Sequence, residues 1–246
     1  MEFFRILNSV DSTNNYAMAA LHAGMAKPGM AWFAMEQSSG KGQRGKAWIS
    51  QPGENILMSV IFQPQALFLS SAFLFNAVVS NTCYSFLTGF MKDEIKIKWP
   101  NDIYLRDRKA GGILIENIYQ GATWKWAVVG IGINVNQVAF ADSIKNGGSL
   151  KQVTGENYDV IKLAKELHQM IVDAFSNIGH STFSEIIRTY NNNLYLINKK
   201  VRLRKQNMVF ETTIKGVNEH GQLLTADRMP RVFEFGEVEW VLNAEI

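Results

Sequence analysis

Along most of the chain, apolar positions follow two periods, which predict strands interleaved with helices. Runs that are apolar or alternate in steps of two predict strands at residues 3–10, 31–36, 55–62, 94–99, 103–105, 110–116 and 123–131. Apolar residues with helical spacing predict helices at residues 15–23, 70–91, 159–178 and 181–193. The run 55–62 is apolar almost throughout, so we expect it at the centre of a sheet, while residues 132–148 predict a long loop.

Beyond residue 194 the pattern changes to short segments that alternate in steps of two. These segments cover residues 201–204, 210–217, 222–225, 232–235 and 238–242. Short strands at such close spacing predict a small β-barrel, whose core is too thin to stand alone. We therefore expect an α+β fold. A mixed β-sheet with helices mainly on one side would form from residues 1–195, and a small C-terminal barrel from residues 196–246 would pack against it.

Composition narrows the class of protein without naming a function. The chain has 246 residues, of which 47% are hydrophobic and 19% charged, so it can bury a full core and is not disordered. Its net charge of +3 suits an anionic ligand but is too weak to imply DNA binding by itself. The start of the chain is charged too soon for a signal peptide, and no apolar run reaches the length of a membrane span. We expect a soluble cytoplasmic protein without a membrane partner.

Residue types that often carry chemistry are scarce. The single cysteine, Cys83, excludes an internal disulfide and favours a reducing compartment. It lies in an apolar run, which predicts a core residue rather than a nucleophile. The four histidines are scattered without the spacing of metal ligands, so the sequence names no ligands for a metal.

Residues 98–116 carry the densest polar signals. Pro100 ends a strand because it has no backbone donor, and a polar turn that holds Asp102 follows. A second, charged turn ends at Lys109, and the glycine pair at 111–112 lets the backbone approach a ligand closely. The hairpin thus predicts Asp102 on one turn and Lys109 on the other. The plain alternative is an exposed hairpin with an acid and a base on its surface.

Residues 40–48, with the sequence GKGQRGKAW, form a glycine-rich basic segment. They partly fit the dinucleotide-binding fingerprint and the P-loop, but both motifs need a helix to begin here, and a proline–glycine pair follows instead. Ala47 also stands where the P-loop needs a hydroxyl for Mg²⁺. A loop on glycine hinges remains, with Lys41, Arg44 and Lys46 available to a phosphate. The alternative is a solvated basic loop without a ligand.

Taken in order, these motifs resemble those of the biotin protein ligases. The most specific part is KWPND at residues 98–102, followed by Lys109 and the glycine pair. The family's loop also runs glycine, basic, glycine and later tryptophan, as in residues 40–48, although Gln43 stands where many members carry arginine. Further matches are the segment 12–14, Gln37 and the strand-end segment 130–136.

The resemblance covers nearly the whole chain. The segment 236–242 resembles the end of the family's SH3-like C-terminal domain. Some members begin with a winged helix that binds DNA, whereas the first strand here starts near residue 3. The resemblance is therefore to the form without that domain, and we expect no DNA partner.

The resemblance implies a fold similar to the class II synthetases and the biotin–lipoate ligases, and an ATP-dependent, AMP-forming enzyme. Biotin and ATP, with Mg²⁺, would give biotinyl-5′-AMP and pyrophosphate. Biotin would then pass to a lysine of the biotin carboxyl carrier domain of a carboxylase. Catalytic roles fall to Lys109, Asp102 and Arg44. Biotin would contact Ser12, Thr13, Asn14, Gln37, Lys41, Gly42, Gln43, Lys109, Gly111 and Gly112. The nucleotide would contact Lys41, Arg44, Trp48, Asn101, Lys109 and Asn134.

Two alternatives stay open. The first is a lipoate–protein ligase of the same superfamily, against which the tryptophan in KWPND and the glycine-basic loop argue. The second is a non-catalytic module that binds RNA or protein, suggested by the basic charge and the SH3-like tail. The presence of Asp102 and Lys109 argues against that module. The sequence leaves open whether the protein is a monomer or a homodimer, and which carboxylase is the acceptor.

Overall fold

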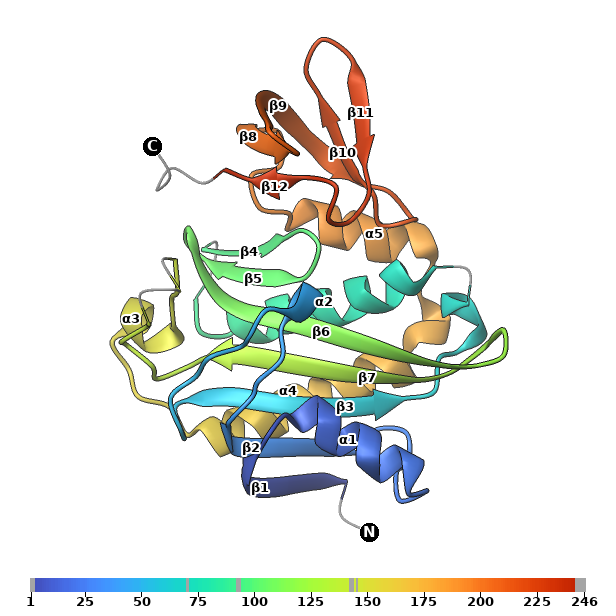
Figure 1. Ribbon diagram of the computed structural model, residues 1–246, viewed down its shortest axis with the longest axis vertical. Helices are drawn as coiled ribbons and strands as arrows, with labels where there is room; N and C mark the ends of the chain where they lie inside the picture. Colours follow the sequence, from blue (N-terminus) through green and yellow to red (C-terminus); the bar gives the residue numbers. More distant parts are fainter. Residues whose placement is uncertain (1–2, 70, 92–93, 142–143, 145, 242–246) are drawn as a thin grey trace.

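The computed structural model describes residues 3–69, 71–91, 94–141, 144 and 146–241. Its centre is one seven-stranded sheet with the order β1-β2-β3-β7-β6-β5-β4 (Figure 1). The strands are β1 (Phe4–Val10), β2 (Ala31–Gln37), β3 (Asn55–Phe62), β4 (Ile95–Lys98), β5 (Asp102–Leu105), β6 (Arg108–Gln120) and β7 (Thr123–Asn134). Strands β1 and β2 are parallel and the other neighbours are antiparallel, which confirms the mixed sheet.

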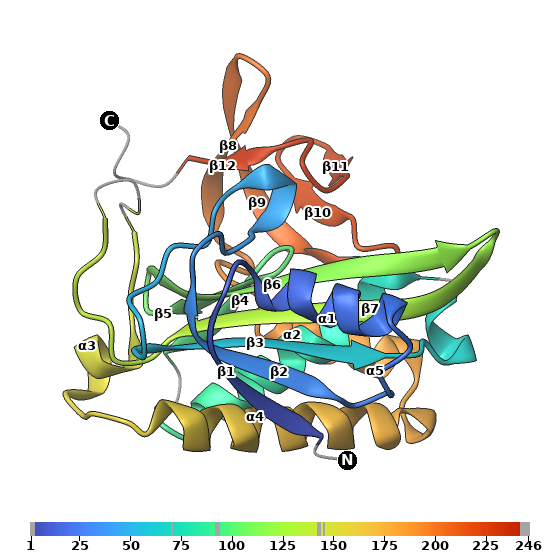
Figure 2. The same cartoon turned by 60° about the horizontal axis from the view of Figure 1, so that its bottom comes forward.

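Strand β3 lies at the centre of the main sheet, between β2 and β7. All of its residues are buried, because helices pack against the strand. The continuous apolar run that predicted this strand has the same limits as the strand itself. The long β6–β7 hairpin projects beyond the rest of the sheet in Figure 2.

The helices are α1 (Thr13–His22), α2 (Ala72–Thr88), α3 (Leu150–Thr154), α4 (Val160–Ser176) and α5 (Phe183–Asn192). Short 3₁₀ turns lie at η1 (Gln43–Gly45), η2 (Ala66–Phe68) and η3 (Ile178–His180). Helices α2, α4 and α5 pack together over one face and contribute to the main hydrophobic core. Helix α1 packs on the other face, against Trp32, Ile61 and Val128. Within the described residues, no helix combines the length and apolarity needed to cross a membrane.

A second, antiparallel sheet follows at the C-terminal end, with the order β11-β10-β9-β8-β12. Its strands are β8 (Lys200–Lys205), β9 (Met208–Val217), β10 (Leu223–Ala226), β11 (Pro230–Phe233) and β12 (Glu239–Trp240). This sheet is compatible with the expected SH3-like barrel. It joins the main core through apolar residues such as Val217 and Leu223, and Trp99 Nε1 donates to the carbonyl of Gly221 at 2.8 Å. The boundary at residue 195 remains a prediction.

The structure differs from the predicted elements mainly at their ends. Strand β6 runs beyond residue 116 because it keeps pairing with β7 through polar positions up to Gln120. Strand β7 runs beyond residue 131 because it keeps pairing with β3 up to Asn134. The predicted loop 132–148 contains the end of β7, and α3 follows it; a helix of five residues is too short to show a helical period. The last predicted strand, 238–242, is reduced to β12, and residue 242 lies outside the described residues.

Candidate active site

A cavity of about 670 Å³ opens on the face of the main sheet that also carries α1. The glycine-rich segment 40–48, the β4–β5 hairpin and the C-terminal sheet complete its walls. Among the residues expected at the site, the structure brings together Ser12, Thr13, Asn14, Gln37, Lys41, Gly42, Gln43, Arg44, Trp48, Asn101, Asp102, Lys109 and Gly112. These residues come from segments far apart in the chain, so the motifs meet in one place.

Asp102 and Lys109 form an ion pair inside the cavity. Lys109 Nζ lies 2.6 Å from Asp102 Oδ1, and both side chains are partly shielded from solvent. The register between β5 and β6 shifts after Ile103, so that Tyr104 rather than Leu105 faces Lys109. Side chains alternate along a strand, and the bulge reverses that alternation in β6. Lys109 therefore points to the cavity together with Asp102, while Ala110 joins the core behind the sheet.

The turn before Asp102 is fixed by hydrogen bonds to the helices and to β6. Asn76 Nδ2 and the hydroxyl of Tyr190 each donate to the carbonyl of Pro100 at 2.8 Å. Asn101 lines the cavity, but its buried amide donates to the carbonyl of Ile113, and Ile113 N donates back to Asn101 O at 3.0 Å. The side chain of Asn101 thus ties the turn to β6 before any ligand is considered.

Trp48 lies flat across two glycines that pair between strands. Gly112 of β6 is the register partner of Gly132 of β7. A Cβ atom at Gly132 would come within 2.5 Å of the indole, and one at Gly112 within 3.0 Å. The absence of side chains at both positions lets the indole form part of the cavity wall. Lys109 Nζ lies 5.7 Å from the centroid of the same ring.

The segment 40–48 folds as a small hairpin. Gly42 N donates to Lys46 O at 2.7 Å, and Trp48 N donates to Gly40 O at 2.8 Å. In Figure 1 this blue segment rises from β2 and crosses in front of β7 and β6. The hairpin lines the cavity, although most of its residues are exposed to solvent, so a ligand contact for its cations stays a prediction.

The tip of this hairpin reaches the C-terminal sheet. Arg44 has a positive φ of 56° and donates from Nη1 to Gly236 O at 3.3 Å. Its guanidinium lies 6.0 Å from the centroid of the Phe235 ring. The neighbouring Gln43 donates from Nε2 to Ile113 O at 3.4 Å, so it turns toward β6.

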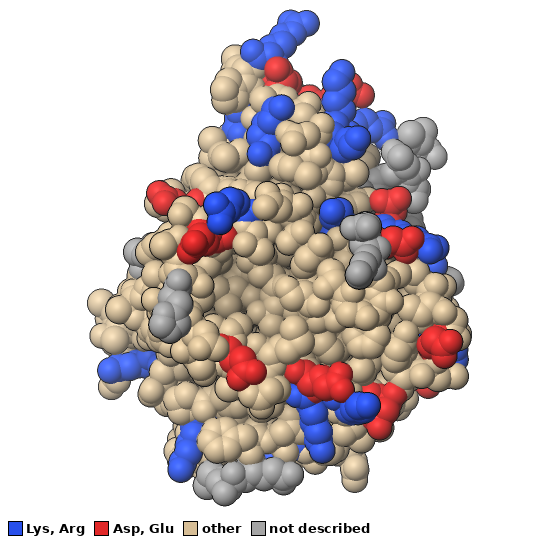
Figure 3. Space-filling model, turned by 180° about the vertical axis from the view of Figure 1, so that it is seen from behind, with Lys and Arg blue, Asp and Glu red and all other residues tan. Residues whose placement is uncertain are grey.

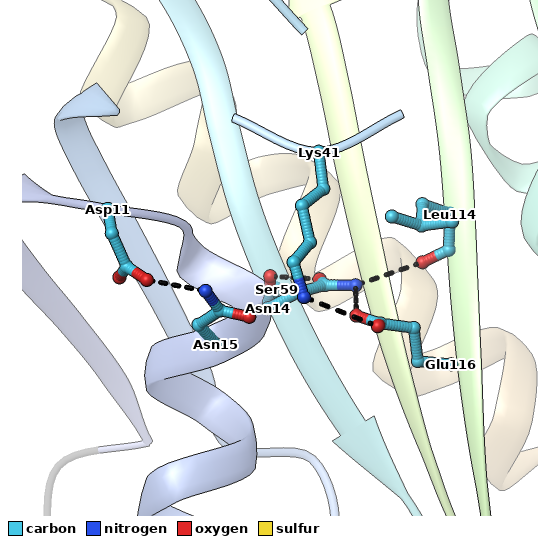
Figure 4. A network of polar contacts seen from close by, with 7 residues as sticks. All are labelled: Asp11, Asn14, Asn15, Lys41, Ser59, Leu114 and Glu116. Atoms are coloured by element: carbon cyan, nitrogen blue, oxygen red, sulfur yellow. Dashed lines mark hydrogen bonds and ion pairs between the residues drawn. The ribbon is translucent and has the colours of Figure 1, made fainter. Parts of the chain in front are cut away.

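At the α1 end of the cavity, polar side chains form a continuous network. Thr13 donates to Gln37 Oε1 from its backbone N at 2.7 Å and from Oγ1 at 3.1 Å. Ser59 Oγ lies 2.7 Å from Thr13 Oγ1 and 2.6 Å from Asn14 Oδ1. Figure 4 shows how the network continues from Asn14 to Glu116 and Lys41.

Two expected site residues do not line the cavity. Gly111 alternates with Gly112 along β6, and the Cβ of Ile103 lies within 3.2 Å of the place where a Cβ at Gly111 would stand. Asn134 is buried and donates from Nδ2 to Gly148 O at 2.9 Å and to Lys109 O at 3.5 Å. In this structure neither residue lines the cavity, and the amide of Asn134 holds the backbone near Lys109 instead.

Lys98 is a cavity residue to which the sequence assigned no role. Its Nζ lies 5.3 Å from the ring centroid of Tyr104 and 5.5 Å from that of Trp240 in β12. Burial lowers the pKa of Lys98 from its usual 10.5 to about 8. In the sequence, its place in the KWPND motif was the one indication that Lys98 belongs to the site. No sequence pattern predicted that Trp240 would contact it.

The cavity is predominantly cationic. Lys41, Arg44, Lys46, Lys98 and Lys109 line it, against the carboxylates of Asp102 and Glu239. On the opposite face of the molecule, basic and acidic side chains are interspersed over the main domain (Figure 3). Among the described residues, no group of three or more His, Cys, Asp and Glu could hold a metal ion. The site is thus suited to an anionic ligand.

Comparisons with known proteins agree with this geometry. Residues 6–134 match the biotin/lipoate A/B protein ligase family. The chain is 29% identical over 220 residues to the bifunctional ligase/repressor BirA of Escherichia coli, covering 89% of this chain and 68% of that protein. It is 32% identical over 177 residues to the biotin–[acetyl-CoA-carboxylase] ligase of Paracoccus denitrificans, covering 70% of each.

The fold is also that of a solved ligase. The biotin protein ligase of Aquifex aeolicus in complex with biotin and ATP superposes with a TM-score of 0.81, at 23% identity, over 98% of this chain and 99% of that one. That likeness shows the shared fold, and the sequence matches show the shared descent. The chain belongs to the biotin/lipoate A/B protein ligase family.

Proposed function

We propose that the protein is a biotin–protein ligase, which converts biotin and ATP to biotinyl-5′-AMP and pyrophosphate and then transfers biotin to a lysine of an acceptor protein with release of AMP. The relatives named above as ligases, and the ligase fold seen with biotin and ATP, support this function. The observation that carries it is the cavity itself. It places a polar network at one end, the Asp102–Lys109 pair beside it, and a cationic hairpin over both.

The polar end of the cavity favours biotin over lipoate. A ureido group offers two N–H donors and one carbonyl acceptor, whereas a dithiolane ring offers no comparable groups. Ser12, Thr13, Asn14 and Gln37 supply hydroxyl and amide groups there, and the first three are almost fully buried. Buried polar groups cost free energy unless they are hydrogen-bonded, so this end of the cavity selects a ligand with complementary polar atoms.

The first step requires cations more than a base. The carboxylate of biotin is already ionised at neutral pH, and it must attack the α-phosphate, which is also negative. Lys109 lies in the cavity where it can offset charge between the two groups, with Lys41 and Arg44 on the hairpin above. When Lys109 turns toward the phosphate, the carboxylate of Asp102 loses its present partner.

The second step requires a neutral amine. The acceptor lysine must lose a proton before it attacks the mixed anhydride, and Asp102 is the carboxylate in the cavity nearest to Lys109. Asp102 therefore orients the incoming amine and accepts its proton. The hairpin 40–48 and Trp48 shield the anhydride from water in the interval between the two steps.

The remaining assignments follow from this function. Mg²⁺ enters with ATP as part of the substrate, since this ion is bound largely through phosphate oxygens and water. The acceptor is a biotin carboxyl carrier domain, as the name of the Paracoccus relative suggests. The catalytic domain covers residues 1–195 and the C-terminal domain covers residues 196–246. The protein acts in the cytoplasm.

Biotin-dependent exchange of labelled pyrophosphate into ATP tests the proposal. The wild-type protein should exchange label with biotin and not with lipoate or without an acid. Incorporation of biotin into a purified carrier domain should follow. Exchange that depends on lipoate would instead identify a lipoate ligase, and a lack of exchange with either acid would favour a binding module without catalysis.

A further inference from the structure

Glu116 lies outside the cavity lining, yet it holds two residues that do line it. Its Oε2 accepts a hydrogen bond from Asn14 Nδ2 at 2.7 Å, and its Oε1 lies 3.6 Å from Lys41 Nζ. Figure 4 shows this carboxylate on β6 between the first helix and the glycine-rich segment. One carboxylate thus joins an expected biotin-binding residue to the base of the hairpin 40–48.

The contact with Asn14 determines which end of its amide is available to a ligand. A carboxylate only accepts hydrogen bonds, so it selects the orientation in which the amide NH₂ points to β6. That NH₂ also lies 3.4 Å from Leu114 O. Asn14 Oδ1 then points toward Ser59 and Gly130, where the lack of a side chain on Gly130 leaves room for it. The free lone pair on Oδ1 suits an N–H donor such as those of a ureido group.

The contact with Lys41 acts on the hairpin. The side chains of Lys41 and Glu116 are 42% and 32% exposed, so solvent weakens their attraction without removing it. Lys41 also pairs through its backbone with Ala47, directly before Trp48. Restraint of Lys41 therefore restrains the hairpin near the point where it covers the cavity.

We propose that Glu116 is a positioning residue that couples the biotin end of the cavity to closure of the hairpin 40–48. It fixes the amide of Asn14 so that an acceptor oxygen faces biotin, and it holds Lys41 so that the hairpin stays down when biotin is bound. This inference rests on the proposed function and deepens it. The two contacts differ in kind: Asn14 needs only an acceptor oxygen, whereas Lys41 needs a negative charge.

Two substitutions separate these contacts. Glu116→Gln keeps an acceptor oxygen for Asn14, but it removes the charge and turns an NH₂ group toward Lys41. It should leave the KM for biotin within about twofold of wild type, and trypsin should cut the biotin-bound protein after Arg44 and Lys46 several times faster. Glu116→Ala removes both contacts. It should raise the KM for biotin about tenfold, the equivalent of one charge-assisted hydrogen bond, and leave the KM for ATP unchanged.

Lys41→Gln and the double variant with Glu116→Gln complete a cycle. If Glu116 acts on the hairpin through Lys41, the double variant is cut no faster than Lys41→Gln alone. Glu166→Gln, on the exposed face of α4, is the matched control and should behave as wild type in every assay. If Glu116→Ala does not fold, the Gln variant and the cycle still decide the question.

Direct biotin binding and trypsin cleavage do not need turnover, so they separate this inference from the proposed function. A wild-type protein that neither binds biotin nor exchanges pyrophosphate overturns the function, and the inference with it. A wild-type protein that does both, with Glu116 variants unchanged in biotin affinity and cleavage, overturns the inference alone. Additive effects of Lys41→Gln and Glu116→Gln, or equal rises in both KM values, also overturn it.

Discussion

Lys109 meets Asp102 at 2.6 Å because a bulge in β6 reverses the direction of its side chain. Without the register shift after Ile103, Lys109 would point to the helical side of the sheet, as Ala110 does in the structure. The bulge therefore places the cation that we propose for the first reaction step on the same face as the carboxylate that we propose for the second. An irregularity in the hairpin is in this case the feature that assembles the site.

Lys109→Ala should reduce adenylate formation by at least about a hundredfold, because the substitution removes a cation from between two negative groups. The protein should stay folded, since partly exposed ion pairs contribute only about 0–1 kcal/mol to stability. Biotin-dependent pyrophosphate exchange measures the first effect, and a thermal melt measures the second. Near-normal exchange in this variant would remove Lys109 from the reaction.

Asp102→Asn should impair transfer to the acceptor at least as much as it impairs adenylation. The amide cannot accept the proton of the incoming amine, and general-base catalysis typically contributes about 10²–10⁴-fold. Single-turnover transfer from preformed biotinyl-5′-AMP isolates this step. A transfer rate equal to that of wild type would assign Asp102 to the orientation of Lys109 alone.

Lys98→Met should stabilise the protein at neutral pH. The pKa of Lys98 is about 8 in the folded protein, against its usual 10.5 when the chain unfolds. Below pH 8 the side chain is charged in both states and its burial costs free energy. As pH rises from about 8 to 10.5, the folded protein loses its proton first, so the wild type gains stability from this group.

Lys98→Met has neither the free-energy cost of burying the charge nor the gain in stability between about pH 8 and 10.5. At pH 7 its free energy of unfolding should exceed the wild-type value by about 1–3 kcal/mol, and the difference should shrink toward pH 10.5. Methionine also keeps an apolar contact with the rings of Tyr104 and Trp240. Denaturant unfolding at several pH values measures the difference. A variant that is less stable at pH 7 would mean that the two rings stabilise the cation more than burial costs.

How far the sequence predicts the site depends on how local each feature is. The run 55–62 is apolar almost throughout, so the limits of β3 can be read directly from it. The motif around Asp102 predicts a hairpin because proline and polar turn residues act on their own neighbours. The pairing of Trp240 with Lys98 depends on where the second sheet packs, and nothing near either residue in the chain encodes that contact.

The positions of Gly111 and Asn134 outside the cavity lining have a physical cause. Gly111 and Gly112 give no hydrophobic or polar pattern, so the sequence cannot tell which of them faces the cavity. Asn134 ends its strand as expected, but its amide is used by the backbone of Gly148 and Lys109. Polar side chains near a site can bond either to a ligand or to the protein backbone. The sequence does not distinguish the two cases, whereas the hydrogen bonds in the structure do.

Arg44 lies at the tip of the hairpin 40–48. Holding this segment in one conformation costs conformational entropy on the order of 1–2 kcal/mol per residue. The hydrogen bonds within the hairpin offset part of that cost, and the contacts of Arg44 with Gly236 and Phe235 tie the tip to the C-terminal sheet. A charge-assisted hydrogen bond to the phosphate of the adenylate would add roughly 1.5–3 kcal/mol.

Arg44→Ala removes both the tie and the cation, so the variant should release biotinyl-5′-AMP at least about ten times faster than wild type. Gln43→Ala should have a smaller effect, because that side chain is neutral and turns toward Ile113. Phe235→Ala removes only the ring contact of the tie and keeps the cation, so it should fall between the two. The half-life of bound adenylate after dilution into unlabelled ligand measures all three. Equal half-lives for wild type and Arg44→Ala would show that closure depends on Lys41 and Trp48, and that the contact between the hairpin tip and the C-terminal sheet does not retain the adenylate.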